Sequence, residues 1–165
     1  MSPTPAEPLM PCILIVDDER QIHASLRLRL GRDCDLVYCL DAREALEKIQ
    51  HAKFDLCFAD IHMPHMDGFA FIEAARERDP ALGYVLLSAF DTDENLRRTI
   101  PLQVYDFISK PLPEKQGFEA RIQEWVDRTR RQRAELQLTA QAGALATDRD
   151  TARLERDIEL VASET

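Results

Sequence analysis

The chain has 165 residues, 45% of them hydrophobic, which is enough for one core-forming domain with an appendage. Its formal net charge is −9, and this acidic balance argues against non-specific nucleic-acid binding, which depends on lysine and arginine. The chain has no apolar run near the ~20 residues that span a bilayer, and residues 1–10 lack the features of a signal peptide. We therefore expect a cytoplasmic protein with a disordered lead-in over residues 1–10 and no direct contact with nucleic acid or membrane.

The first half of the chain alternates short apolar runs with helical patterns. Residues 12–16 are an apolar run that ends in two aspartates, and apolar residues at helical spacing follow over 20–31. A weaker strand is expected over 36–40, and Asp41 is expected to cap a helix that runs to about Gln50. The next apolar run, 54–59, ends at Asp60. Continuous runs of this kind are typical of strands buried on both faces of a parallel sheet.

The second half repeats the alternation. A loop with proline and glycine over 62–68 precedes a helix to about Arg78, and a strand over 84–87 ends at Ser88. Acidic residues from Asp91 open a fourth helix, a strand over 104–108 ends near Lys110, and a fifth helix begins near residue 113 or 114. The pattern predicts a doubly wound α/β fold, with five parallel strands and helices on both faces of the sheet.

Polar side chains stand at the carboxyl ends of four of these strands, where ligands bind in sheets of this type. They are Asp17, Asp18, Asp60, Ser88 and Lys110. Clustered carboxylates fit Mg²⁺, which binds oxygen ligands and keeps several waters. A carboxylate can also attack phosphorus to give an aspartyl phosphate, while an ammonium and a hydroxyl stabilise the transferred group. The pattern predicts magnesium-dependent phosphoryl transfer to an aspartate.

The stretches ILIVDDE, FADIHMPHMDG, LLSAF and FISKPL resemble the signature blocks of response-regulator receiver domains, in order and on matching elements. The resemblance covers residues 11–128 and implies a flavodoxin-like sheet with strand order 2-1-3-4-5. It implies that Asp60 is the phosphoacceptor of a two-component pathway. The donor would be a cognate histidine kinase or a phosphotransfer protein.

The resemblance also assigns the metal ligands. Asp18 would contact Mg²⁺ directly, Asp17 mainly through water, and Asp60 and the backbone carbonyl of His62 would complete the protein ligands. The Lys110–Pro111 peptide would be cis, which is uncommon even before proline.

Further residues are assigned to switching and to the lifetime of the phosphoryl group. Ser88 would donate to the phosphoryl oxygens, and Lys110 would pair with them. The movement of Ser88 toward the phosphoryl group would free space for the switch aromatic Phe107 to turn inward. His62 and Phe90 would flank the path of the attacking water. Because Phe90 is bulky and apolar, we expect slow spontaneous dephosphorylation.

Two other interpretations concern single residue types. A haloacid-dehalogenase-like phosphatase also forms an aspartyl phosphate on a similar sheet, but it needs a second aspartate where this chain has His62. The chain is therefore expected not to be an enzyme beyond its own phosphorylation and dephosphorylation. The four cysteines favour reduced core thiols over a redox or zinc site, since none forms a C-x-x-C pair.

A helical pattern continues beyond the receiver domain. We expect a helix from Glu114 to about Ala142, then a sparse apolar stripe over 144–165, and we assign 129–165 to a helical extension or linker. Two interpretations remain open. The chain is a single-domain regulator that forms a homodimer through the fourth-helix face or the C-terminal helix, or it is the front of a longer regulator whose output domain has been removed.

Overall fold

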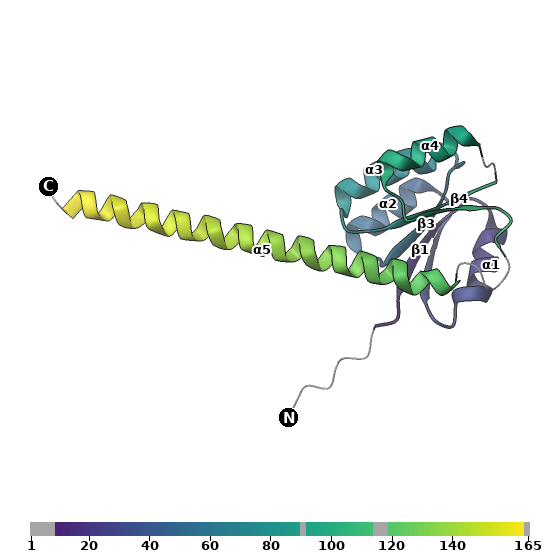
Figure 1. Ribbon diagram of the computed structural model, residues 1–165, viewed down its shortest axis with the longest axis horizontal. Coiled ribbons are helices and arrows are strands. Elements are labelled where there is room, and N and C mark those ends of the chain that lie inside the picture. Colours follow the sequence, from purple (N-terminus) through teal and green to yellow (C-terminus); the bar gives the residue numbers. More distant parts are fainter. Residues whose placement is uncertain (1–8, 90–91, 114–118, 164–165) are drawn as a thin grey trace, which may run out of the picture. The chain divides into compact units, whose positions relative to one another are not determined.

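A computed structural model of the protein describes residues 9–89, 92–113 and 119–163. Within them, parallel strands alternate with helices (Figure 1). The sheet has the order β2-β1-β3-β4-β5, so the predicted doubly wound fold and strand order are confirmed. The strands are β1 Cys12–Val16, β2 Asp35–Cys39, β3 Leu56–Asp60, β4 Tyr84–Ser88 and β5 Asp106–Ser109.

Helices cover both faces of this sheet, because successive residues of each strand point to opposite sides. Leu14 and Val16 face one buried cluster together with α2, α3 and the end of α4, whereas Ile13 and Ile15 face a second cluster with α1 and the start of α5. The helices are α1 Arg20–Leu30, α2 Ala42–His51, α3 Gly68–Arg78, α4 Asp93–Leu102 and α5 Glu119–Ser163.

Side-chain caps fix the starts of three helices. The Asp41 carboxylate accepts a hydrogen bond from the Glu44 backbone N–H at 2.9 Å, as the sequence predicted. Asp67 and Thr92 act in the same way at the starts of α3 and α4. These caps satisfy N–H groups that have no partner within the helix.

The chain divides into two compact units, one up to Arg130 and the other from Arg131 onward. In the first unit, the opening turns of α5 bury Ile122, Trp125, Val126 and Thr129 against the sheet. The second unit is the remainder of α5, and every described residue from 134 to 163 is exposed.

The end of α5 corrects one expectation. The sequence pattern predicted a helix that ends near Ala142, but α5 continues through Gly143 to Ser163. A glycine within a helix costs only about 1 kcal/mol relative to alanine, and the strong helix formers around Gly143 offset that cost. The predicted start near residue 113 or 114 borders 114–118, which lie outside the described residues, as do residues 1–8 of the expected lead-in.

All four cysteines are free thiols; Cys34, Cys39 and Cys57 are buried, and Cys12 is half-buried. Burial raises the pKa of both Cys34 and Cys39 to about 11, so these thiols stay protonated at neutral pH. This supports the interpretation as core thiols. No helix in the described part of the chain combines the length and the apolar character needed to cross a membrane.

Candidate functional site

Four carboxylates gather at the carboxyl edge of the sheet. Asp17, Asp18 and Glu19 follow β1, and Asp60 ends the neighbouring strand β3; one oxygen from each lies within 4.8 Å of the others. Asp17 and Asp60 are buried, with 0% and 3% of their surface exposed, whereas Asp18 and Glu19 are exposed. The sequence predicted three members of this cluster. Glu19 was missed, although it directly follows the aspartate pair.

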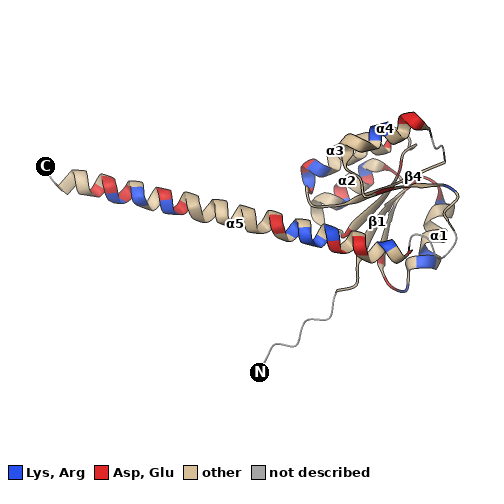
Figure 2. Ribbon diagram, in the orientation of Figure 1, with Lys and Arg blue, Asp and Glu red and all other residues tan. Residues whose placement is uncertain are grey.

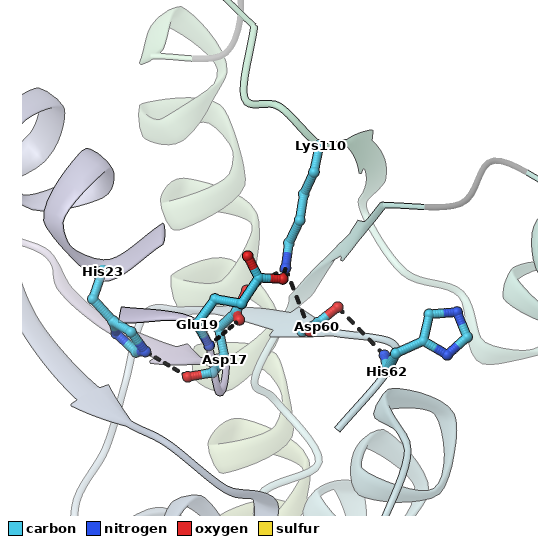
Figure 3. Close-up of polar contacts among 6 residues, drawn as sticks. All are labelled: Asp17, Glu19, His23, Asp60, His62 and Lys110. Carbon is cyan, nitrogen blue, oxygen red and sulfur yellow. Dashed lines mark hydrogen bonds and ion pairs between the residues drawn. The ribbon is translucent and has the colours of Figure 1, made fainter. Parts of the chain in front are cut away.

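Lys110 brings a positive charge to the same place (Figure 3). Its Nζ lies 2.8 Å from Asp17 Oδ2, 3.2 Å from Glu19 Oε1 and 3.4 Å from Asp60 Oδ2. The backbone N–H of Lys110 donates to the Ser88 carbonyl at 2.7 Å, which extends the pairing of β5 with β4 beyond the strand ends. The peptide from Lys110 to Pro111 is cis, as predicted.

Burial and like charge shift the acidity of the two inner carboxyls. Burial, and next the charge of Asp17, raise the pKa of Asp60 to about 6, while Lys110 acts in the opposite direction. Burial also raises the pKa of Asp17, although Lys110 partly offsets it. Burial would lower the pKa of Lys110, but its contacts with Asp17, and next with Asp60 and Glu19, together outweigh burial and raise it. One ammonium therefore does not balance the negative charge of this cluster.

The cluster fits a magnesium ion. Its donors are all carboxylate oxygens, two of its residues are open to water, and the charge imbalance favours a further cation. Transition metals that prefer nitrogen or sulfur have a poorer match, because the cluster contains no histidine or cysteine.

The loop between β3 and α3 folds back on the end of β3. The His62 backbone N–H donates to Asp60 Oδ1 at 3.3 Å, and the Gly68 N–H donates to the Ile61 carbonyl at 2.8 Å. A Cβ atom at position 68 would lie 2.5 Å from the Asp60 carbonyl oxygen, so only glycine fits this close approach. The His62 side chain is exposed and points away from Asp60 (Figure 3).

A buried histidine supports the β1–α1 loop. His23 Nε2 donates to the Asp17 carbonyl oxygen at 2.6 Å, and the ring meets Tyr38 edge-on at 5.1 Å between centroids. His23 was missed by the sequence analysis. Its position on the buried face of α1, beside Ile22 and one turn before Leu26, was the available signal.

The expected switch residues lie on adjacent strands. Ser88 ends β4, fully buried, one residue beyond Leu87, which pairs with Asp60. Phe107 on β5 is half-buried and packs against the cluster formed with α2 and α3. Phe90 lies outside the described residues.

The fold and this edge of the sheet define a receiver domain. Residues 13–122 match the family described as the response regulator receiver domain, and the chain belongs to this family. The response regulator protein PilR of Pseudomonas aeruginosa is 29% identical over 100 residues, which cover 60% of this chain and 22% of PilR. The alkaline phosphatase synthesis transcriptional regulatory protein PhoP of Bacillus subtilis is 31% identical over 100 residues, or 60% of this chain and 42% of PhoP.

Solved structures agree with this assignment. A CheY-like response regulator receiver domain protein from Methanospirillum hungatei JF-1 has a TM-score of 0.68 and 26% identity, covering 74% of this chain and 98% of that one. The predicted family is thus confirmed. The chain spans less than half the length of the two curated regulators described above.

Proposed function

We propose that Asp60 accepts a phosphoryl group from the phosphohistidine of a cognate histidine kinase or phosphotransfer protein. The observation that carries this proposal is the meeting of a buried strand-end carboxylate with Lys110 and three further acids at one edge of a receiver fold. In this step an Asp60 oxygen attacks phosphorus, the phosphorus–nitrogen bond breaks, and the electron pair stays with the imidazole.

The neighbouring side chains position and stabilise the transferred group. Lys110 pairs with the phosphoryl oxygens, which its place 3.4 Å from Asp60 Oδ2 supports, and the Ser88 hydroxyl donates to them. Asp18, Asp17, Asp60 and the His62 carbonyl would hold Mg²⁺. The bound ion supplies positive charge to the phosphoryl oxygens.

The phosphorylated domain acts as a switch for protein binding, and its own phosphorylation and dephosphorylation are its only reactions. Movement of Ser88 toward the phosphoryl group lets Phe107 turn inward, which changes the face formed by α4 and β5. His62 and Phe90 set the rate of phosphoryl loss. We assign residues 11–128 to the receiver domain of a cytoplasmic protein and 129–165 to an extension or linker, with a homodimer through the α4 face or the C-terminal helix.

A labelling experiment tests the phosphoacceptor. Wild type and Asp60→Asn are incubated with a radiolabelled small-molecule phosphodonor and Mg²⁺, and the label is then challenged with hydroxylamine, which cleaves acyl phosphates. An amide cannot replace the nucleophilic carboxylate, so Asp60→Asn takes up no label. Asp33→Asn, which changes an exposed loop acid, is labelled like wild type. Label retained on Asp60→Asn at the wild-type level, or label on wild type that resists hydroxylamine, would exclude Asp60 as the acceptor.

A further inference from the structure

The second unit of the chain exposes large apolar side chains along a helix whose described residues from 134 to 163 are all exposed. Packing supplies most of the stability of a helix in water, so a segment of this kind needs a partner. The exposed fractions of these side chains run from 43% to 71%, and the residues are Leu136, Leu138, Leu145, Leu154, Ile158, Leu160 and Val161.

One face of this helix is free of charge over most of its length. Eight positions with successive spacings of 4, 3, 4, 4, 3, 4 and 3 residues share it: Leu136, Ala140, Gly143, Thr147, Thr151, Leu154, Ile158 and Val161. We call this set the seam. Its mean spacing is close to the ~3.6 residues per turn of a straight α-helix, so the seam stays on one face without strong supercoiling.

The two halves of the seam differ in size and in surroundings. The half nearer the receiver domain has small residues, Ala140 and Gly143, and residues 136–147 contain no charged side chain. This uncharged stretch of α5 lies between two charged ones (Figure 2). The distal half has large residues flanked by acids: Asp150 and Asp157 on one side, Asp148 and Glu155 on the other.

We propose that residues 131–163 pair antiparallel with the same segment of a second copy of this chain. When one helix is reversed against the other, the seam aligns with itself in complementary sizes. Ala140 meets Ile158 and Gly143 meets Leu154, so each of these small residues faces a large one and no gap is left opposite them. The remaining layers are Leu136 with Val161 and Thr147 with Thr151.

Charge selects the same orientation. In a parallel pair, Ala140 and Gly143 would face their own copies and leave space, and the acids that flank the distal seam would lie beside identical acids, which repel. The antiparallel pair places Glu155 and Asp157 beside the uncharged stretch around Gln137, Thr139 and Gln141, so that only Asp148 and Asp150, near the two-fold axis, still lie close to their own copies. This inference deepens the homodimer of the proposed function, and it does not require Asp60 to accept phosphate.

Cysteine cross-linking of the full-length chain tests the orientation. Leu136→Cys and Val161→Cys chains carry tags of different size and are oxidised separately and as a mixture. The antiparallel pair gives a mixed disulfide in the mixture and none with either variant alone. Self-linked Leu136→Cys or Val161→Cys without the mixed product would establish a parallel pair and overturn the proposal. Wild type controls for the native thiols, and Leu145→Cys, on the opposite face, controls for random collision.

Matched lysine substitutions test the seam. Ile158→Lys places a charge in the seam, whereas Leu160→Lys changes a side chain of similar exposure, 62% against 68%, on another face. Sedimentation equilibrium should show dimerisation of Ile158→Lys weakened at least ~10-fold, since a charge buried in the interface is costly, with Leu160→Lys unchanged. A monomeric wild type at high micromolar concentration, or equal behaviour of the two variants, would refute the seam. Labelling of Ile158→Lys at Asp60 is measured in parallel, which separates a failure of the dimer from a failure of the phosphoacceptor.

Discussion

Asp60 combines two properties that oppose each other in the metal-free protein. It is a carboxylate, which the proposed chemistry requires, yet it is buried beside a second carboxylate. Burial, and then Asp17, raise its pKa to about 6, so its charge at neutral pH destabilises the folded state. Function at this residue therefore has a cost in stability.

The cost predicts a stabilising substitution. Because the folded-state pKa lies above the ordinary value, the folded protein binds more protons than the unfolded chain between about pH 4 and pH 6. The unfolding free energy of wild type should fall as pH rises through this window. Asp60→Asn should show a smaller fall, because only the raised pKa of Asp17 remains in this cluster, and should be more stable by about 2 kcal/mol at pH 7, with little difference near pH 4. Urea unfolding in EDTA across this range measures both effects. A difference that does not vary with pH would contradict the assignment.

The positions of Asp17, Asp18, Asp60 and Lys110 followed from the sequence, because the carboxyl ends of parallel strands meet at one edge. The positions of two neighbouring residues, Glu19 and His23, did not follow from the sequence. Glu19 reaches Lys110 only because the loop turns at Asp17, whose Oδ1 accepts the Glu19 backbone N–H at 2.8 Å. The contact of His23 with a backbone carbonyl likewise depends on loop geometry. Hydrophobic periodicity carries no information about such turns.

The start of α5 is fixed to the receiver domain by polar contacts as well as by its buried face. Arg130 Nε lies 3.0 Å from Asp55 Oδ1 and its Nη2 3.2 Å from Asp55 Oδ2, and Nη2 also donates to the Leu9 carbonyl at 2.8 Å. The Tyr105 hydroxyl lies 3.0 Å from the Thr129 hydroxyl, and the Arg128 guanidinium lies over the Tyr105 ring. These contacts involve the last turn of α5 within the first unit.

We expect Arg130→Ala to lower the unfolding free energy of the receiver domain by about 1 kcal/mol, because the two-pronged ion pair with Asp55 is lost. The partial exposure of this ion pair to solvent limits the effect. Arg131→Ala is the matched control. Arg131 is exposed, and its loss should change stability by less than about 0.5 kcal/mol. Urea unfolding of both variants gives the comparison. Equal effects would mean that the pair with Asp55 contributes nothing specific.

A second contact joins Gly83, directly before β4, to Tyr105, directly before β5. A Cβ atom at Gly83 would lie 2.0 Å from the Tyr105 ring, so Gly83→Ala must displace that ring and should destabilise the protein by about 1–3 kcal/mol. A double-mutant cycle with Tyr105→Ala isolates the cause. If the clash is with the ring, Gly83→Ala should cost much less in the Tyr105→Ala background. The same cost in both backgrounds would place the strain elsewhere.

The alternation of strands and helices made the receiver fold predictable from the sequence. The length of α5 was not predictable in this way. Five short apolar runs, each followed by a helical pattern, leave few topologies, and the observed order is one of the two common doubly wound orders. The described residues beyond Arg130 form no buried core that could enforce a hydrophobic period, and a glycine such as Gly143 is typical of the end of a helix. Local patterns are weak evidence where packing does not decide the structure.

The two units should therefore unfold independently and respond to different ligands. The proposed Mg²⁺ site requires the folded receiver domain, so Mg²⁺ at a concentration 100 times its dissociation constant should raise the unfolding free energy by about 2.7 kcal/mol. Asp18→Asn should lose most of this gain because it removes a proposed direct ligand, whereas Asp33→Asn should keep it. The helix of residues 131–163 should instead melt in a transition that depends on protein concentration and not on Mg²⁺, because its proposed ligand is a second copy of the chain. Tryptophan fluorescence follows the first transition through Trp125, and far-ultraviolet circular dichroism follows both. A single transition that shifts with Mg²⁺ and with protein concentration together would show that the units are coupled.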